Sequence, residues 1–319
     1  MSFLILIFFF YRIVVISGQH TQPTVDEQYG DLGALKDRLY QHVWELSEEI
    51  GERHHEQADA LNKAAEYIKK EFSHINLDVK LQSFGEQPYQ NLIAEVSGSE
   101  ESSEIIIIGA HYDTVWLSPG ADDNASGIAA LLEFAHALSG SHPKKTIRFV
   151  AFANEEHPFS GTDEMGSRVY ARTVLEKNEN IAGMFSLEML GFFSDIPGSQ
   201  QYPAYIRWFY PDTASFIAFT SNLSSRSLLV RAIKHYNGNS SVPVQGLVVP
   251  AFLVPDIRRS DHASFWELGY PAVMITDTAN FRNMNYHSVG DVIGTLNFES
   301  MARVVSGLTK MIALLAATD

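Results

Sequence analysis

Acidic and imidazole residues follow the strongly apolar segments of this sequence, and their types suit metal binding. His111-Tyr112-Asp113 comes after the run Ile105–Ile108, and Asn154-Glu155-Glu156 comes after Phe149–Phe152. Glu188 ends a third apolar segment. Imidazole nitrogens and carboxylate oxygens are common ligands of catalytic zinc in sites that lack cysteine. The pattern therefore predicts that these side chains meet at a metal site.

Two further clusters supply the same donor types. The loop Gly120–Gly127, with Asp122-Asp123-Asn124 at its centre, leads into an expected helix, and Tyr286-His287 follows a later loop. In an open α/β sheet, ligands bind where the strands end at their carboxyl edge. Since independent accidents would not place all of these clusters at strand ends, they favour a two-metal site.

Each cluster alone also has a simpler explanation. His111 could be a hydrogen-bonded core histidine, Asp122-Asp123-Asn124 could cap the following helix, and Glu155-Glu156 could be a solvated pair. Glu188 is harder to explain in this way. A carboxylate among apolar neighbours is costly to bury unless it is paired or ligated.

Stretches of β-branched or alternating apolar residues alternate with stretches of helical periodicity along the chain. Strands are expected at 77–84, 91–96, 105–108, 146–152, 181–187 and 271–276, the first two as an antiparallel edge. Helices are expected at 31–50, 58–72, 127–138, 165–177, 225–236 and 298–317, and pocket-shaping loops at 202–211 and 242–255. This order predicts an α/β fold, a doubly wound, mostly parallel sheet with helices on both faces.

The composition limits what the site and its partners can be. The 319-residue chain carries 23 Lys+Arg and 38 Asp+Glu, a net charge of −15, which argues against binding nucleic acid. Cysteine is absent, so any metal must be held by histidine, aspartate and glutamate. Hydrophobic residues make up 45% of the chain, enough for a large globular core.

The N-terminus predicts export. Phe3 to Tyr11 is an unbroken apolar run that suits a signal peptide and is shorter than the ~20 residues needed to span a bilayer. The expected location is secreted or periplasmic, with no stable membrane partner. The alternative is an uncleaved membrane anchor over residues 1–17. The expected divisions are 1–18 as signal peptide or anchor, 19–37 as polar linker and start of the first helix, and 38–319 as the catalytic domain.

Six motifs follow one another between about residues 40 and 314. They are His111-Tyr112-Asp113, Gly120-Ala121-Asp122-Asp123-Asn124-Ala125-Ser126-Gly127, Asn154-Glu155-Glu156, Ser186-Leu187-Glu188-Met189, Arg259-Ser260-Asp261-His262 and Tyr286-His287. Any one of them is weak, but the ordered set resembles the co-catalytic zinc exopeptidases. That family includes secreted bacterial aminopeptidases, glutamate carboxypeptidases and glutaminyl-peptide cyclotransferases.

The resemblance implies a ligand set for two zinc ions. By position, Asp123 bridges the two ions, Glu156 and His287 complete one site, and His111 and Glu188 complete the other. Each Zn²⁺ then has three protein ligands and keeps an open position for water. Many relatives have aspartate where this chain has Glu188, which leaves the occupancy of that second site open.

The resemblance also implies catalytic roles. Glu155 is the general base for the attacking water. Asp113 accepts the second N–H of His111 and fixes its tautomer. The Tyr286 hydroxyl stabilises charge on the tetrahedral oxygen, with simple packing as its alternative role. The peptide bond from Asp123 to Asn124 is expected to be cis.

We therefore expect a zinc aminopeptidase acting on peptides. A glutaminyl-peptide cyclotransferase is the alternative enzyme, but the resemblance places Trp before the last zinc-binding histidine there, so Tyr286 favours the peptidase. Carboxypeptidases of the group tend to carry extra domains for which this chain has no room. A non-catalytic binding module is the third alternative, and the complete donor clusters and the presence of Glu155 oppose it.

Overall fold

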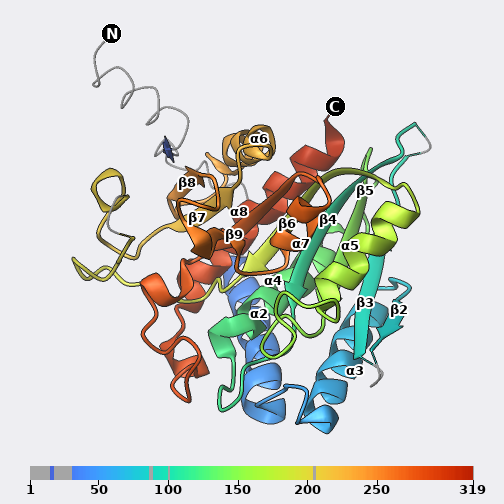
Figure 1. The fold of residues 1–319 in the computed structure, drawn as a ribbon, viewed down its shortest axis with the longest axis horizontal. Helices are drawn as coiled ribbons and strands as arrows, with labels where there is room; N and C mark the ends of the chain where they lie inside the picture. Colours follow the sequence, from blue (N-terminus) through green and yellow to red (C-terminus); the bar gives the residue numbers. More distant parts are fainter. Residues whose placement is uncertain (1–14, 18–30, 86–88, 100, 204–205, 319) are drawn as a thin grey trace.

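A nine-stranded mixed sheet runs through the molecule (Figure 1). The computed structural model describes residues 15–17, 31–85, 89–99, 101–203 and 206–318. Its strands are β1 (Val15–Ser17), β2 (Lys80–Phe84), β3 (Tyr89–Val96), β4 (Glu104–His111), β5 (Thr146–Phe152), β6 (Asn180–Glu188), β7 (Ile217–Ser221), β8 (Val244–Val248) and β9 (Ala272–Thr276). They lie in the order β1-β8-β7-β9-β6-β4-β5-β3-β2. The central strands β5, β4, β6 and β9 are parallel, whereas β3 and β7 are antiparallel to their central neighbours.

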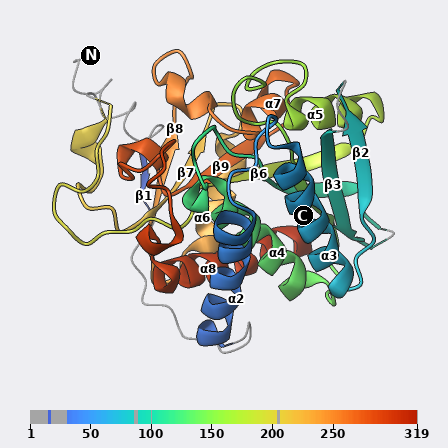
Figure 2. The same cartoon turned by 90° about the horizontal axis from the view of Figure 1, so that it is seen from below.

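Helices cover both faces of the sheet (Figure 2). They are α2 (Leu32–Trp44), α3 (Ala58–His74), α4 (Gly127–Leu138), α5 (Gly166–Glu176), α6 (Arg226–Tyr236), α7 (His262–Glu267) and α8 (Phe298–Ala317), and α2 continues as a π-helix over Glu45–Ile50. The core on one face is built with α2, α3, α4, α6 and α8. The core on the other face is built with α5 and α7.

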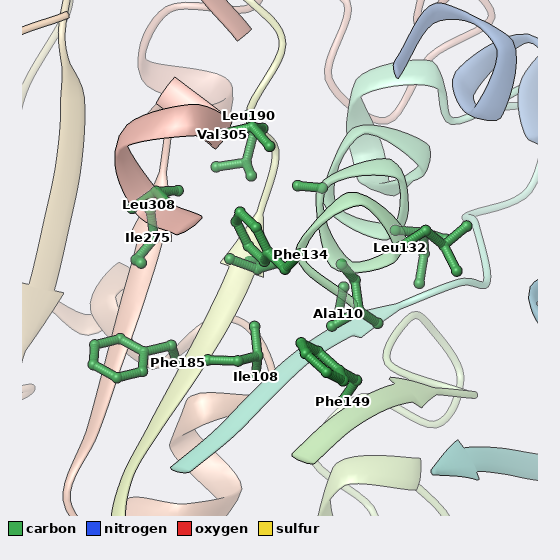
Figure 3. Close-up of a cluster of buried hydrophobic side chains, with 14 of the residues drawn as sticks. Ile108, Ala110, Leu132, Phe134, Phe149, Phe185, Leu190, Ile275, Val305 and Leu308 are labelled. Carbon is green, nitrogen blue, oxygen red and sulfur yellow. The ribbon is translucent and has the colours of Figure 1, made fainter. Parts of the chain in front are cut away.

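The larger core lies between the central strands and the pair α4 and α8. Figure 3 shows Phe134 of α4 above Ile108 of the sheet, and Leu308 of α8 beside Ile275, with Phe185 in the same cluster. By length and composition alone, α8 could cross a membrane, but 61% of its apolar window is buried in this core. Its apolar sequence is therefore explained by packing.

The chain crosses the sheet so that a crevice forms between two parallel strands. From β4 it passes through α4 to β5 on one side, and from β5 it returns through α5 to β6 on the other side of β4. Such a reversal of strand order opens a crevice at the carboxyl ends, where open α/β sheets bind their ligands. His111 and Glu188 are the last residues of β4 and β6.

The predicted α/β fold with helices on both faces is confirmed, and every expected strand and helix is present. Those at 127–138, 146–152 and 298–317 have the expected bounds, and the ends of the others are shifted. Three strands were not predicted: β1, which lies in the expected export signal, β7, and β8, which lies inside the expected loop 242–255. β7 and β8 are only five residues long, and Gly246 interrupts the β pattern of β8, so neither gives a strong signal in the sequence.

The predicted export signal and polar linker fall mostly outside the described residues. Of residues 1–30, only Val15–Ser17 are described, and they pair with β8 in antiparallel fashion. The first helix begins at Leu32, within the range expected to contain its start. The division of the chain at residues 18 and 37 stays a prediction.

Candidate metal centre

Two sets of metal-binding donors meet at the crevice and share one aspartate. His111 Nε2 is 3.3 Å from Asp123 Oδ1 and 3.6 Å from Glu188 Oε2. On the other side of Asp123, His287 Nε2 is 3.1 Å from Asp123 Oδ2 and 3.2 Å from Glu156 Oε1. The donor atoms of each set lie within 4.8 Å of one another. Asp123 thus turns one oxygen toward each set.

Unpartnered polar atoms mark the first of these sets. His111 Nε2, Asp123 Oδ1 and Glu188 Oε2 are buried, and none has a hydrogen-bond partner among the described residues. Leaving a buried polar atom unpaired costs about 1–3 kcal/mol, so such atoms are normally satisfied. A divalent cation would satisfy all three together. One imidazole nitrogen with two carboxylate oxygens is a donor set that suits zinc.

The carboxylate of Asp113 holds the two adjacent glutamates in place. Its Oδ1 accepts the Glu155 backbone N–H at 3.1 Å, and its Oδ2 accepts that of Glu156 at 3.0 Å. His111 Nδ1 lies 3.2 Å from the Asp113 backbone oxygen and 3.5 Å from its Oδ1. The predicted contact to the imidazole is therefore made more closely by the backbone than by the carboxylate. With either contact, His111 Nδ1 faces Asp113, and His111 Nε2 is the nitrogen that faces the centre.

Asp291 holds the backbone of the shared aspartate in the same way. Its carboxylate accepts the backbone N–H groups of Asp122 at 2.9 Å and of Asp123 at 3.0 Å. This residue comes from the loop that also carries His287. The sequence analysis missed it, because an isolated aspartate in a polar loop gives no signal of its own.

Asn124 fixes the backbone on both sides of Glu188. Its Nδ2 donates to the Leu187 carbonyl at 2.8 Å, and its Oδ1 accepts the Met189 N–H at 3.0 Å. The peptide bond from Asp123 to Asn124 is cis, as the resemblance implies. One loop thus supplies the shared ligand and also positions a ligand that comes from β6.

A fully buried arginine ties the same loops to the N-terminal helices. The Arg53 guanidinium donates at 2.7–3.0 Å to the backbone carbonyls of Leu46, Gly51, Tyr112, Pro119 and Gly120. Gly120 has a φ of +62°, and a Cβ there would lie 2.4 Å from the backbone carbonyl oxygen of Asp123 and 3.1 Å from Arg53 Nη2. Only glycine allows this close approach.

Burial and neighbouring carboxylates raise the pKa values of the two adjacent glutamates, Glu155 and Glu156. Burial raises the pKa of Glu155 well above its usual value, and Glu156 and Glu188 act in the same direction against His111. Burial and Asp123 raise the pKa of Glu156 to about 7, against the opposing effect of His287. A carboxyl group with a raised pKa is suited to exchange protons near neutral pH.

The pKa values of the two imidazoles, His111 and His287, are raised, although burial alone would lower them. Burial alone would lower the pKa of His287, but Asp123 and Glu156 raise it to about 10. His111 likewise has a pKa raised well above its usual value, because Glu188, Asp113 and Asp123 outweigh burial. Without a cation, this centre therefore holds protons on its imidazoles.

An apolar pocket of ≈ 110 Å³ lies beside the centre. Its floor is formed by residues of β7, β8 and β9, namely Ala218, Thr220, Gln245, Leu247, Met274 and Thr276. Its walls include Tyr202, Ile206, Tyr210 and Val254, so both ranges expected to shape a pocket do so. Glu188 and Tyr286 line the pocket and thereby connect it to the centre.

Tyr286 stacks on the ligand candidate that follows it. Its ring lies 3.7 Å from the His287 ring, at an interplanar angle of 20°. Burial and four carboxylates, Asp123 and Glu156 foremost, raise the pKa of its hydroxyl. The hydroxyl therefore stays protonated and can donate a hydrogen bond.

The structure brings together every residue proposed for the site from the sequence. These are His111, Asp113, Asp123, Glu155, Glu156, Glu188, Tyr286 and His287. Sequence reasoning missed the roles of Asp291, Asn124 and Arg53, which act through backbone contacts that no motif spacing reveals.

Fold and centre together define an α/β protein with a zinc-compatible site, and the comparisons with known proteins name the class. Peptidase family M28 matches residues 91–312. The chain belongs to this family of peptidases.

Several relatives show how far this similarity extends. The uncharacterized protein YfbL of Escherichia coli (strain K12) is 38% identical over 88% of this chain and 88% of its own length. A probable zinc metalloprotease of Pyrenophora tritici-repentis (strain Pt-1C-BFP) is 28% identical over 67% of this chain, which spans only 49% of that protein. Family and relatives support a zinc-dependent peptidase.

Solved structures share the fold at low sequence identity. The LapA aminopeptidase of Legionella pneumophila has a TM-score of 0.69 and 19% identity, covering 94% of this chain and 78% of its own. The glutaminyl cyclase of Fimbriiglobus ruber has a TM-score of 0.64 and 19% identity, covering 93% of this chain and 98% of its own. The fold therefore accommodates both chemistries.

Proposed function

We propose that this protein is an aminopeptidase that binds two zinc ions and removes N-terminal residues from peptides. The observation that carries the proposal is the pair of donor sets that share Asp123 beside an apolar pocket. Asp123, Glu156 and His287 would hold one ion, and Asp123, His111 and Glu188 the other. Zinc, when bound, lowers the pKa of a water molecule and polarises the substrate carbonyl.

The residues of the chain supply the proton transfers and the orientation. Glu155, held by Asp113, takes a proton from the attacking water and returns it to the leaving amine, a task that its raised pKa suits. The Tyr286 hydroxyl donates a hydrogen bond to the oxygen that develops charge in the transition state. The pocket receives the side chain of the N-terminal residue.

The polarity of the peptidase follows from the charge of the site. Glu155, Glu156, Glu188 and Asp123 surround the reaction centre with carboxylates. With both ions bound, Glu155 is the one of these carboxylates that holds no ion, and together with the net charge of −15 it favours a protonated α-amino group over a free α-carboxylate. The substrate class is therefore peptides with a free N-terminus.

The test combines metal analysis with a substrate panel. Free peptides should be hydrolysed from the N-terminus, and their N-acetylated counterparts should react at least tenfold more slowly. Two zinc ions should be found per active chain, and exhaustive chelation should abolish activity. Release of C-terminal residues first, or full activity with metal confirmed absent, would refute the proposal.

The same panel separates the alternatives. Cyclisation of N-terminal glutamine without peptide hydrolysis would show a glutaminyl cyclase, a chemistry that the fold of the Fimbriiglobus ruber enzyme also hosts. Zinc or peptide binding without turnover of any substrate would show a binding module.

We also propose export, on the basis of the apolar run near the N-terminus. N-terminal sequencing of the protein from the culture medium, periplasm and membrane fractions distinguishes a cleaved signal from an anchor. A mature chain beginning near residue 18 supports cleavage, and a chain retained in the cytoplasm with its N-terminus intact contradicts export.

A further inference from the structure

The pocket beside the centre is built for a large apolar side chain. Its floor presents Leu247 and Met274, and its walls carry Phe216, Phe281 and Ile206. Its volume of ≈ 110 Å³ is of the order of the ~150 Å³ cavity known to hold benzene. A leucine- to phenylalanine-sized side chain would fill it, whereas an alanine side chain would leave most of it empty.

The walls of this pocket are joined by one buried cation. Arg282 is 4% exposed, and its Nε donates to Gln200 Oε1 at 2.9 Å and to Thr278 Oγ1 at 3.1 Å. Its Nη1 donates to the Phe216 carbonyl at 2.9 Å, and its guanidinium carbon lies 4.7 Å from the centre of the Phe216 ring. All three partners line the pocket, although Arg282 itself does not.

Gln200 completes the connection between two wall segments. Its Nε2 donates to Thr278 Oγ1 at 2.9 Å, and the backbone N–H of Gln201 donates to the Phe281 carbonyl at 2.7 Å. The segment around residue 200 is thereby joined to the segment 278–281. The planar guanidinium fork suits this arrangement, because it offers several donors in one fixed geometry, which a lysine ammonium does not.

We propose that Arg282 is a positioning residue for specificity, which holds the pocket in the shape that selects large apolar N-terminal side chains. This inference rests on the proposed aminopeptidase function. Arg282 acts through Gln200, Thr278 and Phe216 and does not touch the substrate. It is therefore expected to control KM and discrimination between substrates.

Arg53 provides the matched control. Among the described residues, it is the other arginine whose pKa burial lowers to about 10, as it does for Arg282. Two of its five carbonyl partners, Tyr112 and Gly120, belong to the segments that carry His111 and Asp123, and none of the five lines the pocket. Arg53 thus supports the segments that carry metal donors, and Arg282 supports the walls of the pocket.

The experiment compares Arg282→Lys with Arg53→Lys on aminoacyl amides of phenylalanine, leucine and alanine. In the unchanged protein, kcat/KM for phenylalanine or leucine should exceed that for alanine at least ~10-fold, the order expected for methylenes placed in an apolar pocket. Arg282→Lys should lower this ratio by about tenfold through KM. Zinc content and kcat for the alanine substrate should stay within about twofold of the unchanged protein. Arg53→Lys should weaken zinc binding and lower kcat while the ratio persists.

Three outcomes would overturn the inference. The first is a ratio near one in the unchanged protein. The second is a ratio that Arg282→Lys leaves intact, and the third is an equal loss in both variants, which would show a merely structural role. If Arg282→Lys does not fold, Gln200→Ala removes the same connection and should lower the ratio in the same direction.

A binding measurement separates this inference from the proposed function. If no aminoacyl substrate is hydrolysed, the proposed function fails. Calorimetry with phenylalaninamide and alaninamide then still compares the unchanged protein with Arg282→Lys. Tighter binding of phenylalaninamide that the variant loses supports the pocket assignment, and equal binding of the two ligands refutes it.

Discussion

The molecule buries two clusters of carboxylates and imidazoles, and they differ in how completely their polar atoms are satisfied. The first is the metal centre around Asp123. The second, here named the α2–α4 cluster, consists of Arg38, His42, Tyr67 and Glu133. In it, Glu133 accepts from Arg38 Nε at 3.0 Å and Nη2 at 2.8 Å, and lies 3.2 Å from His42 Nε2. His42 Nδ1 lies 2.7 Å from the Tyr67 hydroxyl.

Both carboxylate oxygens of Glu133 and both ring nitrogens of His42 have close polar partners, whereas the metal centre leaves three buried atoms without a hydrogen bond among the described residues. Burial would raise the pKa of Glu133, but His42 and Arg38 lower it. At the centre, the pKa of Glu155 and Glu156 is raised. The comparison shows that the same residue types can stabilise a fold or can be left unsatisfied at a site where chemistry requires it.

The largest expected effect concerns the adjacent pair Glu155 and Glu156 at the metal centre. Glu155→Gln keeps size and removes the proton acceptor, so kcat should fall by about 10²–10⁴ with zinc content unchanged. Glu156→Gln removes an anionic ligand, so one zinc ion should bind much more weakly and activity should fall with it. Zinc stoichiometry and kcat of both variants measure the contrast.

The roles assigned to the pair would be reversed if Glu155→Gln lost zinc while Glu156→Gln kept it. Asp113 contacts the backbone of both residues, so both variants retain the same anchoring contacts. A difference between them therefore reports on their side chains alone.

The ligand set was predictable because His111, Glu156 and Glu188 lie at or just after strand ends, where apolar periodicity gives strong signals, and because the resemblance to the co-catalytic zinc exopeptidases supplied Asp123 and His287. His111 and Glu188 follow from the runs that became β4 and β6. The supports were not predictable. Arg53 binds carbonyls, and Asp291 binds backbone N–H groups, and such contacts depend on how distant loops meet. The same holds for β7 and β8, whose short segments are recognisable as strands only once β9 is beside them.

The second prediction concerns the α2–α4 cluster. Glu133→Ala should destabilise the protein by about 3 kcal/mol, because it leaves His42 and Arg38 without their carboxylate partner. The value lies at the low end for broken buried pairs, since the Arg38 side chain is 43% exposed and can turn toward water. Denaturant unfolding of the zinc-loaded protein measures the loss, and kcat per folded molecule should not change.

A fall in kcat comparable to that of Glu155→Gln would break the comparison, because it would tie the α2–α4 cluster to catalysis. Lys69→Ala serves as a control for surface ion pairs. Lys69 pairs with Glu66 at 3.4 Å on the exposed side of α3, where the expected effect on stability is within about 1 kcal/mol.

The third prediction uses the opposite pKa shifts of the two clusters. The raised pKa of His287 means that its contribution to the metal-free protein is full below about 6.5 and is lost as pH rises toward 10. The lowered pKa of Glu133 means that its contribution is present above about 4.5 and is lost as pH falls through the lowered value. The metal-free protein should therefore lose stability between pH 7 and 10.

The part of this loss due to His287 should be smaller than the ~1.4 kcal/mol per pH unit of one full proton, because 34% of the His287 side chain is exposed. His111, whose pKa is also raised, adds a loss of the same sign. Zinc must displace the proton from His287, so zinc affinity should rise over the same range until hydroxide competes. Thermal unfolding with and without chelator, together with zinc titration at several pH values, checks both trends. A metal-free protein that gains stability between pH 7 and 10 would contradict the charge state inferred for the centre.

The smallest expected effect comes from a single hydroxyl of the α2–α4 cluster. Tyr67→Phe removes the partner of His42 Nδ1 and keeps the ring, which packs edge-on against the imidazole at 6.0 Å. One hydrogen bond of this kind is worth about 1 kcal/mol, and Glu133 still holds the other nitrogen of the ring. The loss should therefore be about a third of that for Glu133→Ala.

In a double-mutant cycle, the double variant should lose less stability than the sum of the losses of the two single variants, because Tyr67 acts on Glu133 through His42. Strict additivity would show that the cluster is a set of independent contacts, and the contrast with the metal centre would then rest on charge alone.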